Sequence, residues 1–332
     1  MARTRRAPPL VALAALGCAL ACGRSPVWLP CGPQIADDDV PSPTCEHPSC
    51  PSSNVAQLAL PPSNALIVLD RSCSMVVLID GRTKWSRAVE AIVGVLADPL
   101  SQSLRWGLTL FPDGDTDGIQ APPLIPVAPE QSAQVAQLLL DALEPTNEHY
   151  PRQPGEPCFT DLVVVTELLT NTDVFGEVDG QGHVIFITDG LAEGLGRVTE
   201  NLELLFERGV PTFVVGFGEQ VNTSALQQMG EAGGVPASAQ TAYYRAGLDD
   251  LGRALRQVVQ SLGCRHALRL RPEDVGRMMV RTDDGQVVPE DPQGIDGWRY
   301  DEQTESLLFA GAACEQLLAG EITTIELRLD CQ

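Results

Sequence analysis

The sequence predicts an α/β protein with a doubly wound, mostly parallel sheet, helices on both faces and a small C-terminal β-rich region. Short apolar runs such as "ALIVLD" (65–70) are typical of strands that are buried on both faces. Stretches with apolar residues at helical spacing alternate with these runs, and this alternation favours parallel strands joined by right-handed helical crossovers. After Cys264 the pattern changes to short strand-like runs separated by Gly, Pro and Asp.

The expected elements of the sheet region follow one another from residue 64 to residue 262. Its strands are expected at 65–70, 104–111, 183–188, 210–218 and 241–246, the last of them at an edge. Its helices are expected at 84–99, 129–143, 161–170, 196–209, 223–234 and 248–262. The strand-like runs of the C-terminal region lie at 266–272, 304–312 and 323–330. Sheets of this kind bind ligands at the carboxyl ends of their strands, so a site is expected in the loops that follow them.

Composition divides the chain into four parts. We expect a signal peptide at 1–22, a Pro-, Ser- and Cys-rich tether at 23–62, the α/β domain at 63–262 and a small disulfide-braced β-rich region at 263–332. The formal charge of −22 argues against nucleic acid or an anionic membrane surface as a partner, because each phosphate contact needs a basic side chain.

The N-terminus predicts export. A basic start is followed by the short apolar run "PPLVALAALGCALAC", which is too short to span a membrane. The segment resembles a bacterial lipoprotein signal, with Cys22 or Cys18 as the lipidated residue, and Cys22 leaves the more usual apolar length before it. Ala19 and Ala21 also fit the cleavage site of a simple secretory signal. We expect an exported protein, lipid-anchored in the bacterial cell envelope, at the outer membrane or in the periplasm.

Oxygen-bearing side chains follow two of the predicted strands. Asp70, Ser72 and Ser74 come directly after the first strand, and Asp189 ends the strand of "HVIFITDG". Carboxylate and hydroxyl oxygens are hard ligands that suit Mg²⁺, Mn²⁺ or Ca²⁺ and do not suit Zn²⁺. A single DxSxS stretch is weak evidence, since Asp and Ser also form turns and helix caps.

With "LDRSCSM" and "ITDG" in this order, the chain resembles the von Willebrand factor type A (vWA) domain family and its metal-ion-dependent adhesion site. The resemblance covers about residues 63 to 262 and implies a six-stranded, Rossmann-like sheet. It also implies that Asp70, Ser72, Ser74, a Thr from a second loop and Asp189 surround a divalent cation, Mg²⁺ by preference. The family binds its partners through this ion, so the implied partner is a protein with an exposed carboxylate. The implied function is metal-dependent binding or adhesion, and not catalysis.

The second loop, "GEPCFTDL", departs from the family pattern. Alignment on the start of the following helix selects Thr160 as the ligand, whereas alignment on "GEP" selects Glu156 or Pro157. We prefer Thr160, and the alternative for it is a plain N-cap of a helix that begins at Asp161.

Eight cysteines lie outside the signal segment, and in an oxidising compartment an even set is typical of disulfides. The vWA fold would bring Cys73 and Cys158 together from the first and second site loops, so we expect a disulfide between them that ties the two loops. For the C-terminal region we prefer a disulfide between Cys314 and Cys331.

Several alternatives stay open. The stretch "DGDTDG" (113–118) begins like an EF-hand loop but lacks the closing Glu, so a solvated acidic turn is the better interpretation. A structural envelope module that keeps the fold without binding a metal is one alternative function. A metal-dependent phosphohydrolase is the other, and the absence of an evident general base speaks against it.

Overall fold

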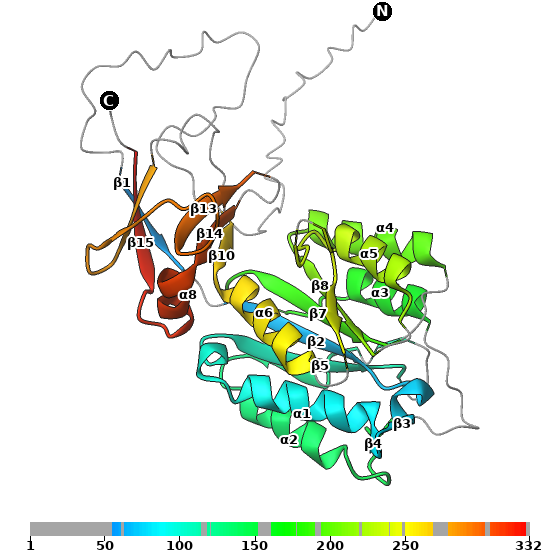
Figure 1. Cartoon of the computed structure of the whole chain (residues 1–332). Coiled ribbons are helices and arrows are strands. Elements are labelled where there is room, and N and C mark those ends of the chain that lie inside the picture. The colour runs from blue at the N-terminus through cyan, green and yellow to red at the C-terminus, as the bar shows by residue number, and fades with distance from the viewer. Residues whose placement is uncertain are drawn as a thin grey trace, which may run out of the picture.

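The structure is a computed structural model that describes residues 55–60, 63–113, 118–119, 121–151, 161–176, 178–189, 194–218, 221–238, 240–247, 250–267, 278–302 and 306–329. Its centre is a six-stranded sheet with the strand order β6-β5-β2-β7-β8-β9 (Figure 1). The strands are β2 (Asn64–Asp70), β5 (Arg105–Phe111), β6 (Ile125–Ala128), β7 (Gly182–Thr188), β8 (Thr212–Phe217) and β9 (Tyr244–Ala246). All neighbours pair in parallel except β6, which runs antiparallel to β5. This confirms the predicted fold class, and β9 lies at an edge as expected.

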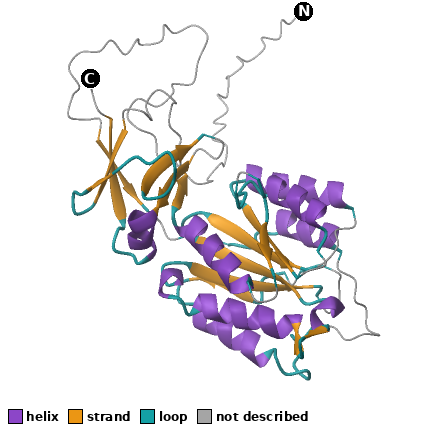
Figure 2. Ribbon diagram, in the orientation of Figure 1, coloured by secondary structure: helices purple, strands orange, loops and turns teal. Residues whose placement is uncertain are grey.

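Three helices cover each face of this sheet. One face carries α1 (Lys84–Leu96), α2 (Ser132–Asp141) and α6 (Leu251–Gly263), and the other carries α3 (Leu162–Asn171), α4 (Leu195–Glu207) and α5 (Thr223–Ala232) (Figures 1 and 2). In β2 the side chains alternate between the two cores: Ile67 belongs to the first and Val68 to the second, and both are buried. A strand with two buried faces has no polar side, which is why these strands are continuous apolar runs.

The C-terminal region is a second, smaller β structure. Its elements are β10 (Arg265–Ala267), β11 (Met278–Thr282), β12 (Val287–Val288), β13 (Gly297–Asp301), β14 (Ser306–Ala310), α8 (Gly311–Leu318) and β15 (Thr324–Leu329). The helix α8 stands where the sequence predicted the end of a strand. Gly311 has φ +58°, a left-handed conformation that ends β14 and that glycine adopts without strain. Buried side chains of this region join the core that α1, α2 and α6 form with the main sheet.

One strand of this region comes from the segment predicted to be a tether. β1 (Val55–Ala59) pairs antiparallel with β15, with Val55 opposite Arg328. The order of this sheet is β1-β15-β11-β12. The chain therefore crosses the C-terminal region before it enters the main sheet at Asn64.

A disulfide fastens the C-terminal region to the main domain. Cys264, at the C-terminal cap of α6, is bonded to Cys314 in α8. The predicted pair of Cys314 with Cys331 is therefore wrong, because the packing of α8 on α6 brings Cys264 closer to Cys314 than sequence distance suggests. Cys331 itself lies outside the described residues.

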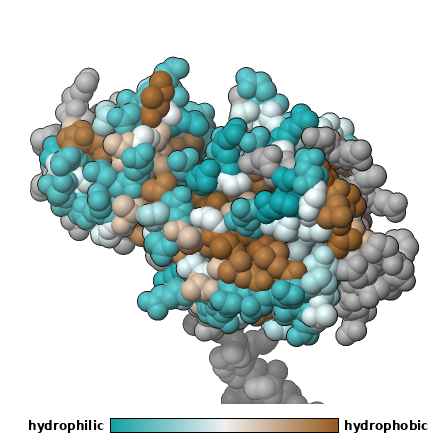
Figure 3. Space-filling view, turned by 60° about the horizontal axis from the view of Figure 1, so that its bottom comes forward, coloured by the Kyte–Doolittle hydropathy of each residue, from teal (hydrophilic) through white to brown (hydrophobic). Residues whose placement is uncertain are grey.

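The described surface has both polar and apolar areas. Figure 3 shows a broad apolar area near the middle of the face that is turned forward there, bordered by polar side chains. The exposed large apolar side chains include Val77 and Leu78, close to the end of β2, and Leu140 of α2. In the described part of the chain, no helix combines the length and the apolar character that crossing a membrane requires.

Candidate metal site

The first site loop begins where β2 ends. Asp70 is the last residue of β2 and is fully buried. Its Oδ1 accepts a hydrogen bond from the backbone N–H of Ser72 at 2.8 Å, and its Oδ2 accepts one from Thr188 Oγ1 at 2.8 Å. Thr188 is the last residue of the neighbouring strand β7. Two loops at the carboxyl end of the sheet thus fix the orientation of this carboxylate.

Hydroxyls connect this loop to the end of β7. Ser72 Oγ lies 2.8 Å from Ser74 Oγ, and Ser74 Oγ donates to Asp189 Oδ1 at 2.7 Å. The one-turn helix η1 (Cys73–Val76) follows Ser72 and turns the chain so that both serines face the same point. The structure therefore brings together four of the five residues that the vWA resemblance implies, namely Asp70, Ser72, Ser74 and Asp189.

The two carboxylates give the site an unfavourable concentration of negative charge. Burial raises the pKa of Asp70 to about 7, with the nearby charge of Asp189 as the second cause. Hydrogen bonds from Ser72 and Thr188 act in the opposite direction. A cation placed between the carboxylates would relieve this repulsion.

A basic side chain also reaches the site. Lys84 is the first residue of α1, and its Nζ lies 2.5 Å from Asp189 Oδ2. The side chain of Lys84 is 14% exposed and that of Asp189 is 1% exposed. The backbone N–H of Lys84 donates to Val77 O, which places the start of α1 beside the first site loop.

The second loop is described only where it enters α3. Thr160 and Cys158 lie outside the described residues, as do Glu156 and Pro157. Asp161 is the N-cap of α3, because its side chain accepts from the N–H groups of Val163 and Val164 at 2.9 and 3.2 Å. The cap role considered for Thr160 is thus filled by Asp161.

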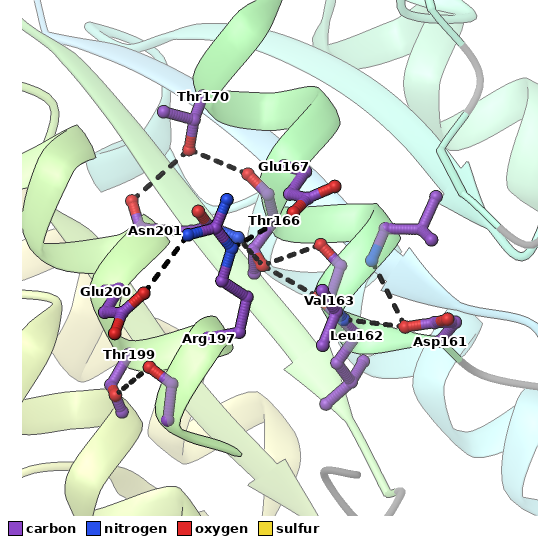
Figure 4. Close-up of polar contacts among 12 residues, drawn as sticks. Asp161, Leu162, Val163, Thr166, Glu167, Thr170, Arg197, Thr199, Glu200 and Asn201 are labelled. Atoms are coloured by element: carbon purple, nitrogen blue, oxygen red, sulfur yellow. Dashed lines mark hydrogen bonds and ion pairs between the residues drawn. The ribbon is translucent and has the colours of Figure 1, made fainter. Parts of the chain in front are cut away.

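Polar contacts hold α3 against α4 and so fix where the second loop joins the domain (Figure 4). Thr166 Oγ1 accepts from Asn201 Nδ2 at 3.0 Å, and Thr170 Oγ1 lies 3.3 Å from the carbonyl oxygen of Asn201, to which it donates. At the surface, Arg197 contacts Glu167 and Glu200, each at 3.2 Å. Thr166, Thr170 and Asn201 are buried, so the seam between the helices is polar but hydrogen-bonded.

Cys73 in the first loop is disulfide-bonded, and its bonded partner is not among the described residues. The pairing with Cys158 stays a prediction.

In the "DGDTDG" stretch, the N–H of Asp113 donates to Gly118 O at 2.7 Å, which closes a turn. The side chains of Asp115 and Asp117 lie outside the described residues.

The donor set fits a hard divalent cation. An octahedral site with metal–oxygen distances of about 2.0–2.1 Å has adjacent oxygens about 2.9 Å apart. The contacts of Ser74 Oγ with Ser72 Oγ and Asp189 Oδ1, at 2.8 and 2.7 Å, are close to this spacing. Within the described ranges, no group of three or more His, Cys, Asp or Glu residues is placed so that it could hold a metal ion. The donors that gather at this site are two carboxylates and two serine hydroxyls.

Comparison with known proteins adds likenesses of fold. No family model matches the chain, and no curated protein matches it. Among solved structures it is similar to proximal thread matrix protein 1 from the mussel byssus, with a zinc-occupied MIDAS motif, at 15% identity and a TM-score of 0.46 over 64% of this chain and 50% of that one. It is also similar to manganese-loaded TRAP protein from Plasmodium vivax, at 19% identity and a TM-score of 0.44 over 62% of this chain and 76% of that one. A third likeness is to the pilus adhesin SpaC from Lactobacillus rhamnosus GG, at 12% identity and a TM-score of 0.43 over 83% of this chain and 40% of that one. The chain thus matches about half the length of the mussel protein.

Two residues of the site were not identified from the sequence. Thr188 precedes Asp189 in "ITDG" and lies within the run that predicts the strand, so the sequence assigns it no separate role. Lys84 is not an oxygen ligand, so the pattern of carboxylates and hydroxyls that predicts the site does not point to it. One feature of the sequence could have drawn attention to Lys84: it is the single lysine, and the other basic residues counted with it are all Arg.

Proposed function

We propose that the protein is a divalent-cation-dependent binding protein, and that the ion held by Asp70, Ser72, Ser74 and Asp189 binds an acidic group of a protein partner. The supporting observation is the convergence of these four side chains, from two loops more than 100 residues apart, on one point at the carboxyl end of the sheet. Mg²⁺, with Mn²⁺ or Ca²⁺ as alternatives, is the ion that the oxygen donors favour. When bound, the ion supplies a positive centre with an open coordination position.

The surroundings of the site suit a protein partner. Val77 is 49% exposed and Leu78 is 66% exposed, and both follow the first site loop within four residues of Ser74. Apolar contact with such side chains would add affinity to a carboxylate–metal bond. The net charge of −22 disfavours acidic partners at long range, so recognition of a carboxylate here would depend on short-range contact with the ion.

Isothermal titration calorimetry with Mg²⁺, Mn²⁺ and Ca²⁺ tests the proposal. We expect binding by the wild-type protein and an affinity at least about tenfold lower for Asp70→Asn, which keeps the shape of the side chain but removes its charge. Glu203→Gln is the matched control, since Glu203 is an exposed acid on α4. Equal affinities for Asp70→Asn and the wild type would contradict the assignment of the site.

A structural module that binds no metal is the second candidate. The contact of Lys84 with Asp189 favours it, because a buried carboxylate that already has an ammonium partner is satisfied without an ion. The same titration separates the two candidates: the structural module would show neither binding heat nor a metal-dependent rise in Tm.

We also propose that the protein acts by binding and not as an enzyme. A phosphohydrolase built on the same ion would turn over phosphoesters in Mg²⁺, and Asp70→Asn would abolish that turnover.

For location we propose export with lipid anchoring at Cys22, which lies outside the described residues. The Cys264–Cys314 disulfide supports export, because such bonds persist in oxidising compartments.

A further inference from the structure

Lys84 is the only lysine of this chain. The sequence contains 22 Lys and Arg residues, and every one except Lys84 is Arg. The single exception lies in the candidate metal site, with its Nζ 2.5 Å from Asp189 Oδ2. The one position at which this chain has Lys in place of Arg is therefore a position in contact with a candidate metal ligand.

The chemistry of the two basic side chains explains such a requirement. Lysine ends in a compact point charge with three donors, whereas arginine ends in a wide, planar fork. The end of the Lys84 side chain lies beside Gly218, just after β8: a Cβ added there would be in ordinary van der Waals contact with it, 3.7 Å from Nζ and 3.8 Å from Cε. In charge and compactness, an ammonium group is the side chain that most nearly takes the place of a metal ion.

The position of Lys84 in its helix is otherwise unfavourable. It is the first residue of α1, where the helix dipole disfavours a positive charge. Its side chain is also largely removed from water. The contact with the buried carboxylate of Asp189 compensates both for the helix dipole and for the removal of the ammonium from water.

We propose that Lys84 is the built-in counter-cation of this site, and that a divalent cation binds by displacing the Lys84 ammonium from Asp189. This inference rests on the proposed metal binding and adds the residue that sets its affinity. In the metal-free state the ammonium balances the charge of Asp189 and keeps the site loops in place. Metal binding must break this contact, so the affinity of the wild-type site is lower than its donor set alone would give.

Displacement also changes the charge that the site offers to a partner. Two ionised carboxylates, one divalent ion and the released ammonium sum to −2 + 2 + 1 = +1. A carboxylate from the partner would neutralise that charge and could contact both the metal ion and Lys84. The same residue would then weaken metal binding alone and favour metal binding together with an acidic partner.

The first experiment compares Mn²⁺ binding by the full-length wild type and Lys84→Met, which keeps most of the side-chain stem and removes the charge. We expect the dissociation constant for Mn²⁺ to fall at least tenfold in Lys84→Met. Arg82→Met is the matched control, because Arg82 is a basic residue two positions away whose ion pair with Glu90 is exposed. We expect the control to change the dissociation constant less than threefold.

The second experiment uses the wild type alone and so does not depend on how well a variant folds. Because the chain has one lysine, Lys84 is its one side-chain amine, and peptide mass spectrometry follows its modification by an amine-reactive acetylating reagent separately from that of the amine at the N-terminus of the purified protein. We expect the acetylation rate of Lys84 to rise at least threefold in saturating Mn²⁺, while the rate at the N-terminal amine stays constant.

The outcomes separate the inference from the proposed function. If the wild type binds Mn²⁺, but with the same affinity as Lys84→Met and with no change in Lys84 acetylation, the counter-cation role is refuted and metal binding stands. Binding by Lys84→Met but not by the wild type would support the counter-cation role and overturn metal-dependent function for the natural chain. If neither protein binds Mn²⁺, both proposals fail.

Discussion

Removal of the Cys264–Cys314 disulfide should lower the free energy of unfolding by about 4 kcal/mol. The bond closes a loop with a sequence separation of 50 residues. In the chain-entropy account, closing such a loop removes about 14 cal/mol/K from the entropy of the unfolded chain, which is ~4 kcal/mol at 25 °C. Since stabilities of whole domains are about 5–15 kcal/mol, this single bond contributes a large part of the total.

The test is urea denaturation of a Cys264→Ala/Cys314→Ala variant, followed by tryptophan fluorescence and far-UV circular dichroism. The free energy of unfolding of a domain of this size falls by about 3 kcal/mol per molar urea, so the urea concentration at the midpoint of unfolding should fall by ~1 M or slightly more. A double serine variant serves as a check, because it loses the same cross-link but fills the site differently. Cys264 follows α6 at the end of the sheet away from the metal site, so affinity for Mn²⁺ should not change.

A loss below about 1 kcal/mol in both variants would refute the reasoning, since it would show that packing of α8 on α6 holds the C-terminal region without the cross-link. If the free energy of unfolding fell strongly in only one of the two variants, the cause would be the packing of the new side chains and not the loss of the cross-link.

Two further predictions concern stability. Burial lowers the pKa of His266 to about 4 from an ordinary value of 6.5, so the unfolded chain binds the proton more tightly than the folded one. Stability should therefore fall by about 3 kcal/mol as the pH decreases from 6.5 to 4, and His266→Gln should flatten this part of a plot of Tm against pH. Gly230→Ala in α5 should destabilise the protein by about 1–3 kcal/mol, because the new Cβ would lie 2.4 Å from the backbone oxygen of Ala242. Gly94→Ala in α1, where nothing lies within 4 Å, is the control and should stabilise by up to ~1 kcal/mol, so equal effects in chemical denaturation would contradict this explanation.

The sequence was most informative where burial is uniform. The strands β2, β7 and β8 are buried along their whole length, so their apolar runs stand out without any alignment. The sequence does not predict β6, because its four residues include Pro126, which is exposed, and only two of them are buried. β1 was missed for another reason: it pairs with a strand about 270 residues later, and nothing local in a Pro- and Ser-rich segment reveals that partner.

In the site, too, residues that are neighbours in the sequence were easier to identify than contacts between distant parts of the chain. Asp70, Ser72 and Ser74 could be identified together because they share one short loop. Their connection to Asp189 depended on recognising a whole fold, because the hydrogen bond from Ser74 to Asp189 spans 115 residues. The contact of Lys84 with Asp189 depends on where α1 starts relative to β7, and no periodicity in the sequence gives that distance.

The pairing of β1 with β15 has a mechanical consequence. A pull on the segment before Val55, resisted at the candidate site, would act along the axis of β1 before it reached β2. Because β1 lies antiparallel against β15 over five residue pairs, this tension would strain the hydrogen bonds of the ladder in shear, all at once and not one after another. The Cys264–Cys314 bond joins the region that contains β15 to α6, so part of the tension would pass through a covalent bond into the main domain. The point where the chain enters the folded structure is thereby reinforced against extension.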